Sequence, residues 1–317
     1  MKDRDIKILE MYNDGYGSNE IAATVGCSVG TVYNALKRGN QETRSGYHGI
    51  KKDFVSEVIK RYNSNESIFS ICNTLGTYQE KVKRILRENN VDVISYSKRK
   101  NPGFVENYFE TIDTNDKAYW LGWLVTDGCI SKTSISITLK SCDRYILEQF
   151  QRDLGLDGKI KPFNGKYTRL MFWSRKMVDD LSKYGIVENK TFTVDLPQIS
   201  EVFVPALLRG CLDGDGGISY FEYGSRKDTE LSFTGNEKCV KSFGKLVHDS
   251  IGMDEKSPTV NNSIFRVRWS SKYDIVKICD KLYENSNGHR LERKYDKYLK
   301  IRNLVYENTK HNTPRCK

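Results

Sequence analysis

The sequence predicts an α+β fold in which two small all-α units precede a pseudo-two-fold pair of αββαββα units. Two observations carry this prediction. The first hundred residues repeat with an offset of 50, and each copy has the hydrophobic spacing of short helices. The remaining residues repeat with an offset of 88, and each copy contains both helical and alternating strand patterns. We therefore expect four segments, at residues 1–45, 46–102, 103–198 and 199–317.

In the N-terminal repeat, residues 21–36 align with residues 71–86. Each copy predicts a short helix, a turn and a second helix, which is the helix-turn-helix arrangement. Gly26 and Gly76 stand where the chain reverses, a position that favours positive φ. The second helices carry polar and basic side chains that suit base edges and phosphates in a major groove. These candidate DNA-binding residues are Ser28, Thr31, Tyr33, Asn34 and Lys37, then Tyr78, Gln79, Lys81, Lys83 and Arg84.

The alternative for this repeat is a pair of helical hairpins used for packing or protein contact. Two copies in register, each with a basic second helix, favour DNA binding. Each copy is followed by a basic, turn-rich segment, at residues 38–49 and 95–103. We expect both segments to be linkers, either solvated or touching the minor groove and phosphates.

Composition narrows the class of protein. The 317 residues carry a formal net charge of +10, which makes polyanions plausible partners. The sequence has no apolar run long enough for a membrane span, and its start lacks the order of a secretory signal. Its eight cysteines include no CxxC pair, and its four histidines have no ligand spacing. We expect reduced thiols in a cytoplasmic protein, without a zinc site or a disulfide framework.

The C-terminal repeat is marked by "YWLGWLVTDG" at residues 119–128 and "LLRGCLDGDG" at residues 207–216. Small residues at a spacing of four line one face of each predicted helix, and such faces let two backbones approach closely. They are Ala118, Gly122 and Thr126, then Ala206, Gly210 and Gly214. Asp127 and Asp215 then lie side by side at the end of this seam. Two such like charges repel unless a divalent cation holds them, and oxygen ligands select a hard ion such as Mg²⁺.

After each acid come a strand, a helix, a strand pair and another helix. The alternation places Ile135, Ile137 and Leu139 on an inner face, and likewise Phe265, Val267 and Trp269. The opposite faces are polar and basic, which suits contact with DNA, although an ordinary solvent face is the alternative. The candidate DNA-binding residues there are Ser134, Ser136, Thr138, Lys140, Arg169, Arg266 and Arg268.

From Gly103 onward, "WLGWLVTDG" and "LRGCLDGDG" resemble the two motif copies of single-chain LAGLIDADG homing endonucleases. The first copy is the looser one, since it starts with Trp120. The resemblance implies two motif helices at a pseudo-two-fold axis and saddle-shaped antiparallel sheets over DNA. It also implies that Asp127 and Asp215 are catalytic ligands of Mg²⁺ or Mn²⁺, with the backbone carbonyls of Thr126 and Gly214 completing the inner shell.

The resemblance further implies a basic residue late in each repeat, close to the scissile phosphates. Lys190 and Lys294 fit this role, and a surface lysine is the alternative for both. Asp213 stands two residues before the motif acid and aligns with Val125. We expect Asp213 to face solvent or to pair with Arg209.

The expected function is a sequence-specific DNA homing endonuclease. As the resemblance implies, such a protein makes a double-strand break across the minor groove, with short 3′ overhangs. We expect a monomer acting on double-stranded DNA in the cytoplasm of a bacterial or phage-infected cell. The alternatives are a non-catalytic DNA-binding transcription regulator on the same fold, whose relatives lack the acid pair, and an intron RNA maturase.

Overall fold

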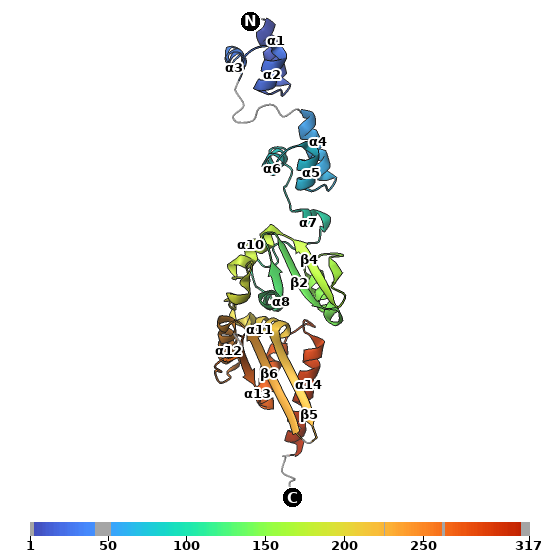
Figure 1. The fold of residues 1–317 in the computed structure, drawn as a ribbon, viewed down its shortest axis with the longest axis vertical. Coiled ribbons are helices and arrows are strands. Elements are labelled where there is room, and N and C mark those ends of the chain that lie inside the picture. The colour runs from blue at the N-terminus through green and yellow to red at the C-terminus, as the bar shows by residue number, and fades with distance from the viewer. Residues whose placement is uncertain (1–2, 42–51, 225, 262–263, 312–317) are drawn as a thin grey trace. The chain divides into compact units, whose positions relative to one another are not determined.

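The computed structural model describes residues 3–41, 52–224, 226–261 and 264–311 (Figure 1). The chain divides into two compact units, Met1–Lys100 and Asn101–Lys317, and each is described by itself. We use "first repeat" for residues 103–198 and "second repeat" for residues 199–317. The boundaries at 45/46 and 198/199 stay predictions.

The N-terminal unit is all helical, as predicted. Its helices are α1 (Asp3–Asn13), α2 (Ser18–Val25), α3 (Val29–Arg38), α4 (Lys52–Asn63), α5 (Ile68–Leu75), α6 (Gln79–Glu88) and α7 (Tyr96–Lys100). Residues of α1 to α3 form one buried cluster, and residues of α4 to α6 form another. The turns come at Gly26 and Gly76, whose φ angles are 68° and 60°. Glycine adopts this left-handed conformation without a steric penalty, so each helix pair turns where the sequence predicts.

The interpretation of residues 95–103 as a linker is wrong in part. Residues 96–100 form α7, and Arg99 joins it to the second helical cluster. The Arg99 guanidinium donates to the carbonyls of Tyr62 (2.6 Å) and Glu66 (2.7 Å) and lies 3.9 Å from the centre of the Tyr62 ring. The other predicted linker, 38–49, lies largely outside the described residues.

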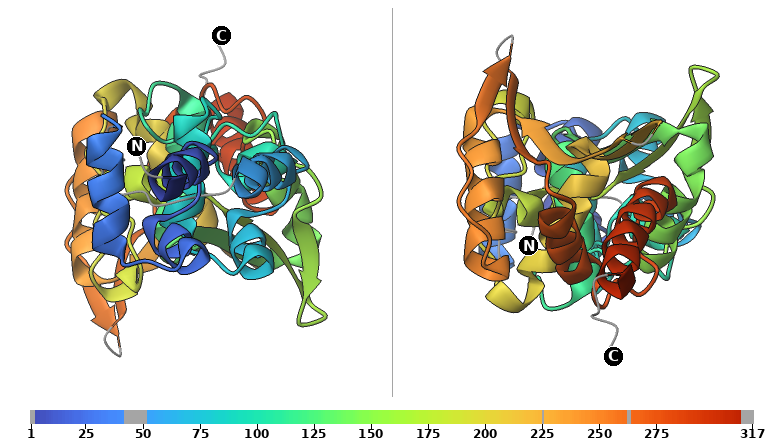
Figure 2. Two further views of the ribbon diagram at one scale, coloured as in Figure 1. Left: turned by 90° about the horizontal axis from the view of Figure 1, so that it is seen from above. Right: turned by 90° about the horizontal axis from the view of Figure 1, so that it is seen from below.

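The second unit confirms the predicted pair of αββαββα repeats, followed by a further helix (Figures 1 and 2). The first repeat contains α8 (Asn115–Thr126), β1 (Gly128–Ile130), β2 (Ser134–Lys140), α9 (Arg144–Asp153), β3 (Ile160–Phe163), β4 (Tyr167–Trp173) and α10 (Arg175–Lys183). The second contains α11 (Val204–Asp215), β5 (Gly216–Tyr223), β6 (Arg226–Gly235), α12 (Glu237–Ile251), β7 (Thr259–Asn261), β8 (Ile264–Trp269), α13 (Lys272–Tyr283) and α14 (Glu292–His311).

Each repeat contributes one four-stranded antiparallel sheet, drawn in green and orange in Figure 2. The strand orders are β1-β2-β4-β3 and β5-β6-β8-β7, so the two sheets are built alike. Ile135, Ile137 and Leu139 are buried as the alternation predicts. Val267 and Trp269 are buried too, whereas Phe265 is only half-buried. The two repeats share one continuous hydrophobic core.

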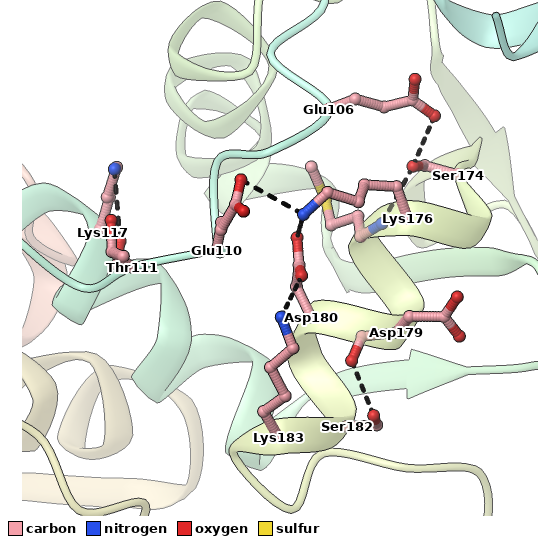
Figure 3. A network of polar contacts seen from close by, with 11 residues as sticks. Glu106, Glu110, Thr111, Lys117, Ser174, Lys176, Asp179, Asp180, Ser182 and Lys183 are labelled. Carbon is pink, nitrogen blue, oxygen red and sulfur yellow. Dashed lines mark hydrogen bonds and ion pairs between the residues drawn. The ribbon is translucent and has the colours of Figure 1, made fainter.

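A network of polar contacts fastens the segment before α8 to α10 (Figure 3). The Asp180 carboxylate is 1% exposed and accepts from Lys176 and Lys183, each at 2.7 Å. Lys176 also lies 3.3 Å from Glu110, and the Ser174 hydroxyl donates to Glu106 at 2.8 Å. These contacts fix the entry of the chain into the first motif helix.

Helices α8 and α11 meet backbone to backbone at two glycines. A β-carbon built on Gly122 would lie 2.4 Å from the Leu207 carbonyl oxygen and 2.9 Å from the Gly210 α-carbon. A β-carbon on Gly210 would lie 2.1 Å from the Tyr119 carbonyl oxygen. No real side chain tolerates such distances to backbone atoms, so the seam requires glycine at both positions.

We predict that Gly210→Ala destabilises the second unit. Alanine gains about 1 kcal/mol in helix propensity over glycine. The overlap with a carbonyl that cannot move aside outweighs this gain, and we expect a net loss of about 1–3 kcal/mol in the free energy of unfolding. Chemical denaturation of the full chain, followed by circular dichroism, measures it.

Gly217→Ala is the matched control, because its β-carbon would lie 3.6 Å from the nearest atom, the Ser232 hydroxyl oxygen. We expect its free energy of unfolding to stay within about 0.5 kcal/mol of the wild type. Equal stability of the two variants would contradict a glycine-dependent seam.

Candidate functional site

The close contact between α8 and α11 places Asp127 and Asp215 next to each other at the C-terminal ends of these helices. Asp127 is the residue that caps the C-terminus of α8, and Asp215 is the last residue of α11. A β-carbon on Gly214 would lie 3.2 Å from Asp127 Oδ2, so the Asp127 carboxylate rests against the last turn of α11. The Thr234 hydroxyl donates to the Asp215 carbonyl at 2.9 Å and ties that end of α11 to the neighbouring sheet.

Both carboxylates are held where their charged forms are disfavoured. Burial raises the pKa of Asp127 to about 6, and the nearby Asp215 carboxylate adds to this rise. Burial also raises the pKa of Asp215. The ammonium groups of Lys190 and Lys294 oppose both shifts. The site therefore holds two partly compensated anions, and a further cation between them would be stabilising.

Neither lysine is a surface residue, since Lys190 is 5% exposed and Lys294 is 4% exposed. Each ammonium group caps the carbonyl end of one motif helix, where backbone oxygens lack intrahelical partners. The acceptors of Lys190 Nζ are the carbonyls of Val125 (2.7 Å) and Thr126 (3.2 Å). Those of Lys294 Nζ are the carbonyls of Leu212 (2.7 Å), Asp213 (2.7 Å), Gly214 (3.4 Å) and Gly216 (2.6 Å). Burial lowers the pKa of Lys294 to about 8.

The turn that carries Lys190 is held by the second repeat. Lys190 begins a single 3₁₀ turn, η2 (Lys190–Phe192). The Asn236 side-chain amide donates to the carbonyls of Thr191 (3.2 Å) and Val194 (2.9 Å). The Asn236 amide oxygen accepts from the Cys239 N–H at 3.0 Å and so caps α12. One asparagine thus links the start of α12 to the Lys190 turn.

The segment before Lys294 is held in turn by the first repeat. Its backbone and side chains bond to residues of α9 and of the 3₁₀ turn that precedes it. The pairs are Gly288 with Gln149 (3.1 Å), His289 with Asp153 (2.6 Å), Glu292 with Tyr145 (2.6 Å) and Arg293 with Asp143 (3.1 Å). Each lysine therefore caps a helix of its own repeat while the opposite repeat fixes the backbone that carries it.

The expectation for Asp213 is wrong. Asp213 is 1% exposed, and its carboxylate accepts from the Tyr119 hydroxyl (3.0 Å) and the Leu291 N–H (2.9 Å). Arg209 is fully buried and donates instead to the carbonyls of His289 (2.9 Å) and Leu282 (2.5 Å). Residues two positions apart project from different faces of a helix, so Asp213 serves the packing between repeats while Asp215 serves the acid pair.

The acids suit a hard divalent cation. Their oxygens are the donor type that Mg²⁺ and Mn²⁺ prefer, and burial raises the pKa of both acids. Within the described ranges, no group of three or more His, Cys, Asp or Glu side chains gathers as a metal site. The carbonyls of Thr126 and Gly214 already accept from lysines, although a carbonyl oxygen has a second lone pair.

The predicted DNA-binding residues of the helical unit differ in availability. Asn34, Lys37 and Gln79 are exposed. Thr31 bonds to the Ser28 hydroxyl at 2.9 Å, and Tyr33 packs against the first helical core. The three predicted basic residues of α6 are half-buried: Lys81 lies 4.9 Å from the Phe54 ring centre, Lys83 pairs with Glu80 at 2.7 Å, and Arg84 also has a partner.

On the sheets, most of the predicted residues share the outward face but are already paired. Arg169 donates to Thr138 at 2.9 Å and stacks 3.5 Å from the Phe163 ring centre. Ser134 bonds to Ser131 at 2.8 Å, Ser136 is 9% exposed, and Lys140 is exposed. In the second sheet Arg266 pairs with Glu230 and donates to Ser232 at 3.1 Å, and Arg268 lies 3.9 Å from Glu230.

Comparison with known proteins gives the following matches. No protein-family model matches the sequence. A protein of Methanocaldococcus jannaschii described as uncharacterized is 31% identical over 152 residues, which are 46% of this chain and 54% of that protein. The chain thus spans about half the length of this curated relative.

Among solved structures, the LAGLIDADG homing endonuclease I-SmaMI bound to cleaved DNA is 12% identical, with a TM-score of 0.46, over 64% of this chain and 93% of that one. The LAGLIDADG meganuclease I-CpaMI bound to uncleaved DNA is 11% identical, with a TM-score of 0.46, over 62% and 92%. In the described part of this chain, no helix has both the length and the hydrophobicity needed to cross a bilayer.

Sequence reasoning missed the residues that brace the site. Asn236 precedes a helix, so its capping role was predictable, but its bonds to the Lys190 turn join residues more than forty positions apart. Asp143 and Asp153 also act across the repeats. Glu230 lies on the outward face among the predicted basic residues, where it partly neutralises two arginines.

Asn236→Asp tests this brace. Aspartate keeps the acceptor that caps α12 but loses the two donors to the Lys190 turn. We expect the amides of Thr193 and Val194, which bond to the Lys190 carbonyl at 2.9 and 2.7 Å, to exchange hydrogen faster. The first turn of α12 should keep its exchange rate in Asn236→Asp and lose protection in Asn236→Ala. Unchanged exchange over 190–194 in both variants would show that Asn236 does not hold the turn.

Proposed function

We propose that this chain is a member of the LAGLIDADG homing endonucleases and hydrolyses both strands of a specific DNA site with a divalent cation. The observation that carries the proposal is the acid pair. Two aspartates, the half-buried Asp127 and the solvent-accessible Asp215, end two helices whose backbones touch, and each helix end is capped by a buried lysine. Packing alone does not explain such a costly arrangement of like charges.

In this proposal Asp127 and Asp215 hold the cation, here Mg²⁺ or Mn²⁺. When bound, it supplies a nucleophile at neutral pH and stabilises the charge that develops on phosphate. The aspartates set its position, because the seam fixes the carbonyl ends of α8 and α11. Lys190 and Lys294 add positive charge beside the reacting phosphates and hold the helix ends rigid. Their direct contact with a phosphate stays a prediction, since their ammonium groups bond to backbone carbonyls.

The polar faces of the two sheets are the proposed DNA surface. To contact DNA, Arg169, Arg266 and Arg268 must exchange their intramolecular partners for phosphates or bases. Because breaking these contacts costs free energy, only DNA that offers good replacement contacts is bound, which favours selectivity over tight non-specific binding. The helical unit is proposed to add major-groove contacts through α3 and α6. A transcription regulator without nuclease activity is the less favoured interpretation, because it has no use for the acid pair.

The first test of this function measures DNA cleavage by variants that lack one of the two acids. We expect Asp127→Asn and Asp215→Asn each to abolish Mg²⁺-dependent double-strand cleavage of DNA that flanks the encoding gene. DNA binding should stay within about threefold of the wild type, because no phosphate contact is removed. Cleavage is followed on agarose gels and binding by fluorescence anisotropy.

Asp213→Asn is the matched control from the same helix. Its Oδ2 accepts from the Tyr119 hydroxyl and the Leu291 N–H, so this variant should retain cleavage at a temperature where it is folded. Wild-type cleavage by either acid variant would contradict the assignment of the site, and so would a fully folded Asp213→Asn protein that does not cleave.

The second test concerns the helical unit. A chain starting at Asn101 keeps the whole core of the second unit and both acids. We expect it to protect a shorter stretch of DNA than the full chain. The slope of its logarithm of the DNA association constant against the logarithm of salt concentration should be shallower by about 0.9 for each phosphate that the helical unit neutralises in the full chain. Equal footprints and equal slopes would show that the helical unit serves packing or protein contact.

A further inference from the structure

One apolar side chain beside the acid pair has no role in the fold. Phe192 is 87% exposed, the largest value among the large hydrophobic residues in the described ranges. Single exposed apolar residues are common in folded proteins and do not by themselves indicate a function. Two further observations, the rigidity of its backbone and its place in the site, distinguish Phe192 from such residues.

Phe192 stands on a turn that is held at several points. It ends the turn η2, which begins with the buried Lys190. The Lys190 carbonyl accepts from the N–H groups of Thr193 and Val194, and Asn236 donates to the carbonyls of Thr191, just before Phe192, and Val194, two residues after it. The backbone that carries the exposed ring is therefore held in place.

The turn borders the site itself. Phe192, Lys190 and Asp215 line one cavity of about 530 Å³. Its rim continues with Ile264, which is 56% exposed, and the half-buried Phe265. DNA bound on the proposed sheet surface passes the acid pair, and its bases there would meet this apolar rim.

The feature belongs to one repeat only. The residue two positions after Lys190 is Phe192, whereas the residue two positions after Lys294 is the exposed Asp296. An acidic side chain is repelled by phosphate and has no affinity for a base stack. The two lysine segments therefore differ, since one is a short turn that ends in the exposed Phe192 and the other continues as α14.

We propose that Phe192 is a wedge that inserts between base pairs of bound DNA next to the acid pair and unstacks that step. The proposal rests on the DNA-binding function proposed above and deepens it. Apolar side chains that insert from the minor groove partially unstack a base step and kink the duplex, and flexible or unpaired steps yield most easily. Phe192 thus favours target sites that deform at one step, without reading the base edges there.

The test uses binding alone, so that it does not depend on cleavage. Two fluorescein-labelled duplexes are compared in EDTA by fluorescence anisotropy. One is fully paired, and the other differs by a single base that creates a central T·T mismatch, which is already partly unstacked. The full-length wild type should bind the mismatched duplex about tenfold more tightly, since less unstacking energy is spent. Phe192→Ala should bind both duplexes with equal affinity.

Phe192→Trp should keep the preference, because indole also wedges and stacks. Val202→Ala is the control for removal of an exposed apolar residue, since Val202 is 74% exposed on a different turn, and it should also keep the preference. A preference that survives in Phe192→Ala, or its absence from the wild type, overturns the wedge.

The outcomes separate this proposal from the function on which it rests. If the mismatch preference depends on Phe192 but no Mg²⁺-dependent cleavage is found, the wedge proposal holds and the nuclease proposal fails. If the protein cleaves DNA but shows no mismatch preference, the nuclease proposal holds and the wedge proposal fails. Failure to bind either duplex would overturn both.

Discussion

The contact between the backbones of α8 and α11 is the constraint on which the site depends. Gly122 and Gly210 let the helix axes approach until each glycine faces backbone atoms of the other helix. Everything at the carbonyl end of the pair follows from this approach. It brings Asp127 and Asp215 together, creates their mutual repulsion, and aligns two sets of unpaired carbonyls that two buried lysines then cap. A wider seam would separate the two acids, although each lysine would still cap the helix of its own repeat.

The repeats also brace each other beyond the seam. Asn236 of the second repeat holds the turn of Lys190, and Asp143, Tyr145 and Asp153 of the first repeat hold the segment that leads to Lys294. Because each half stabilises the charged residue of the other, the site exists only in the assembled pair. Buried charges of this kind cost stability, which is the usual relation between a functional site and the fold that carries it.

Local pattern was enough to predict the fold and the position of Asp127 and Asp215 at the ends of the two motif helices, while their role stays a prediction. The period of small residues found the seam, and strand alternation found Ile135 and Ile137 on the inner face. What it missed depends on contacts between distant residues. Asp213 looked like a solvent-facing acid because no local rule reveals that Tyr119 and Leu291 satisfy it. The burial of Lys190 and the contact of Arg99 with Tyr62 were missed for the same reason. Sequence spacing determines the face of a helix or strand on which a residue lies, but not which distant residues cover that face.

The central claim is that the seam makes one cation site out of two acids. Titration of the full chain with Mn²⁺, followed by the decrease of the free-ion signal in electron paramagnetic resonance, tests it most directly. The account predicts that Asp127→Asn and Asp215→Asn each weaken binding at the same site by about tenfold or more, as removal of a carboxylate ligand requires. It also predicts that the double variant is little worse than either single one. Independent, additive effects of the two variants, or undiminished binding in either, would contradict the claim.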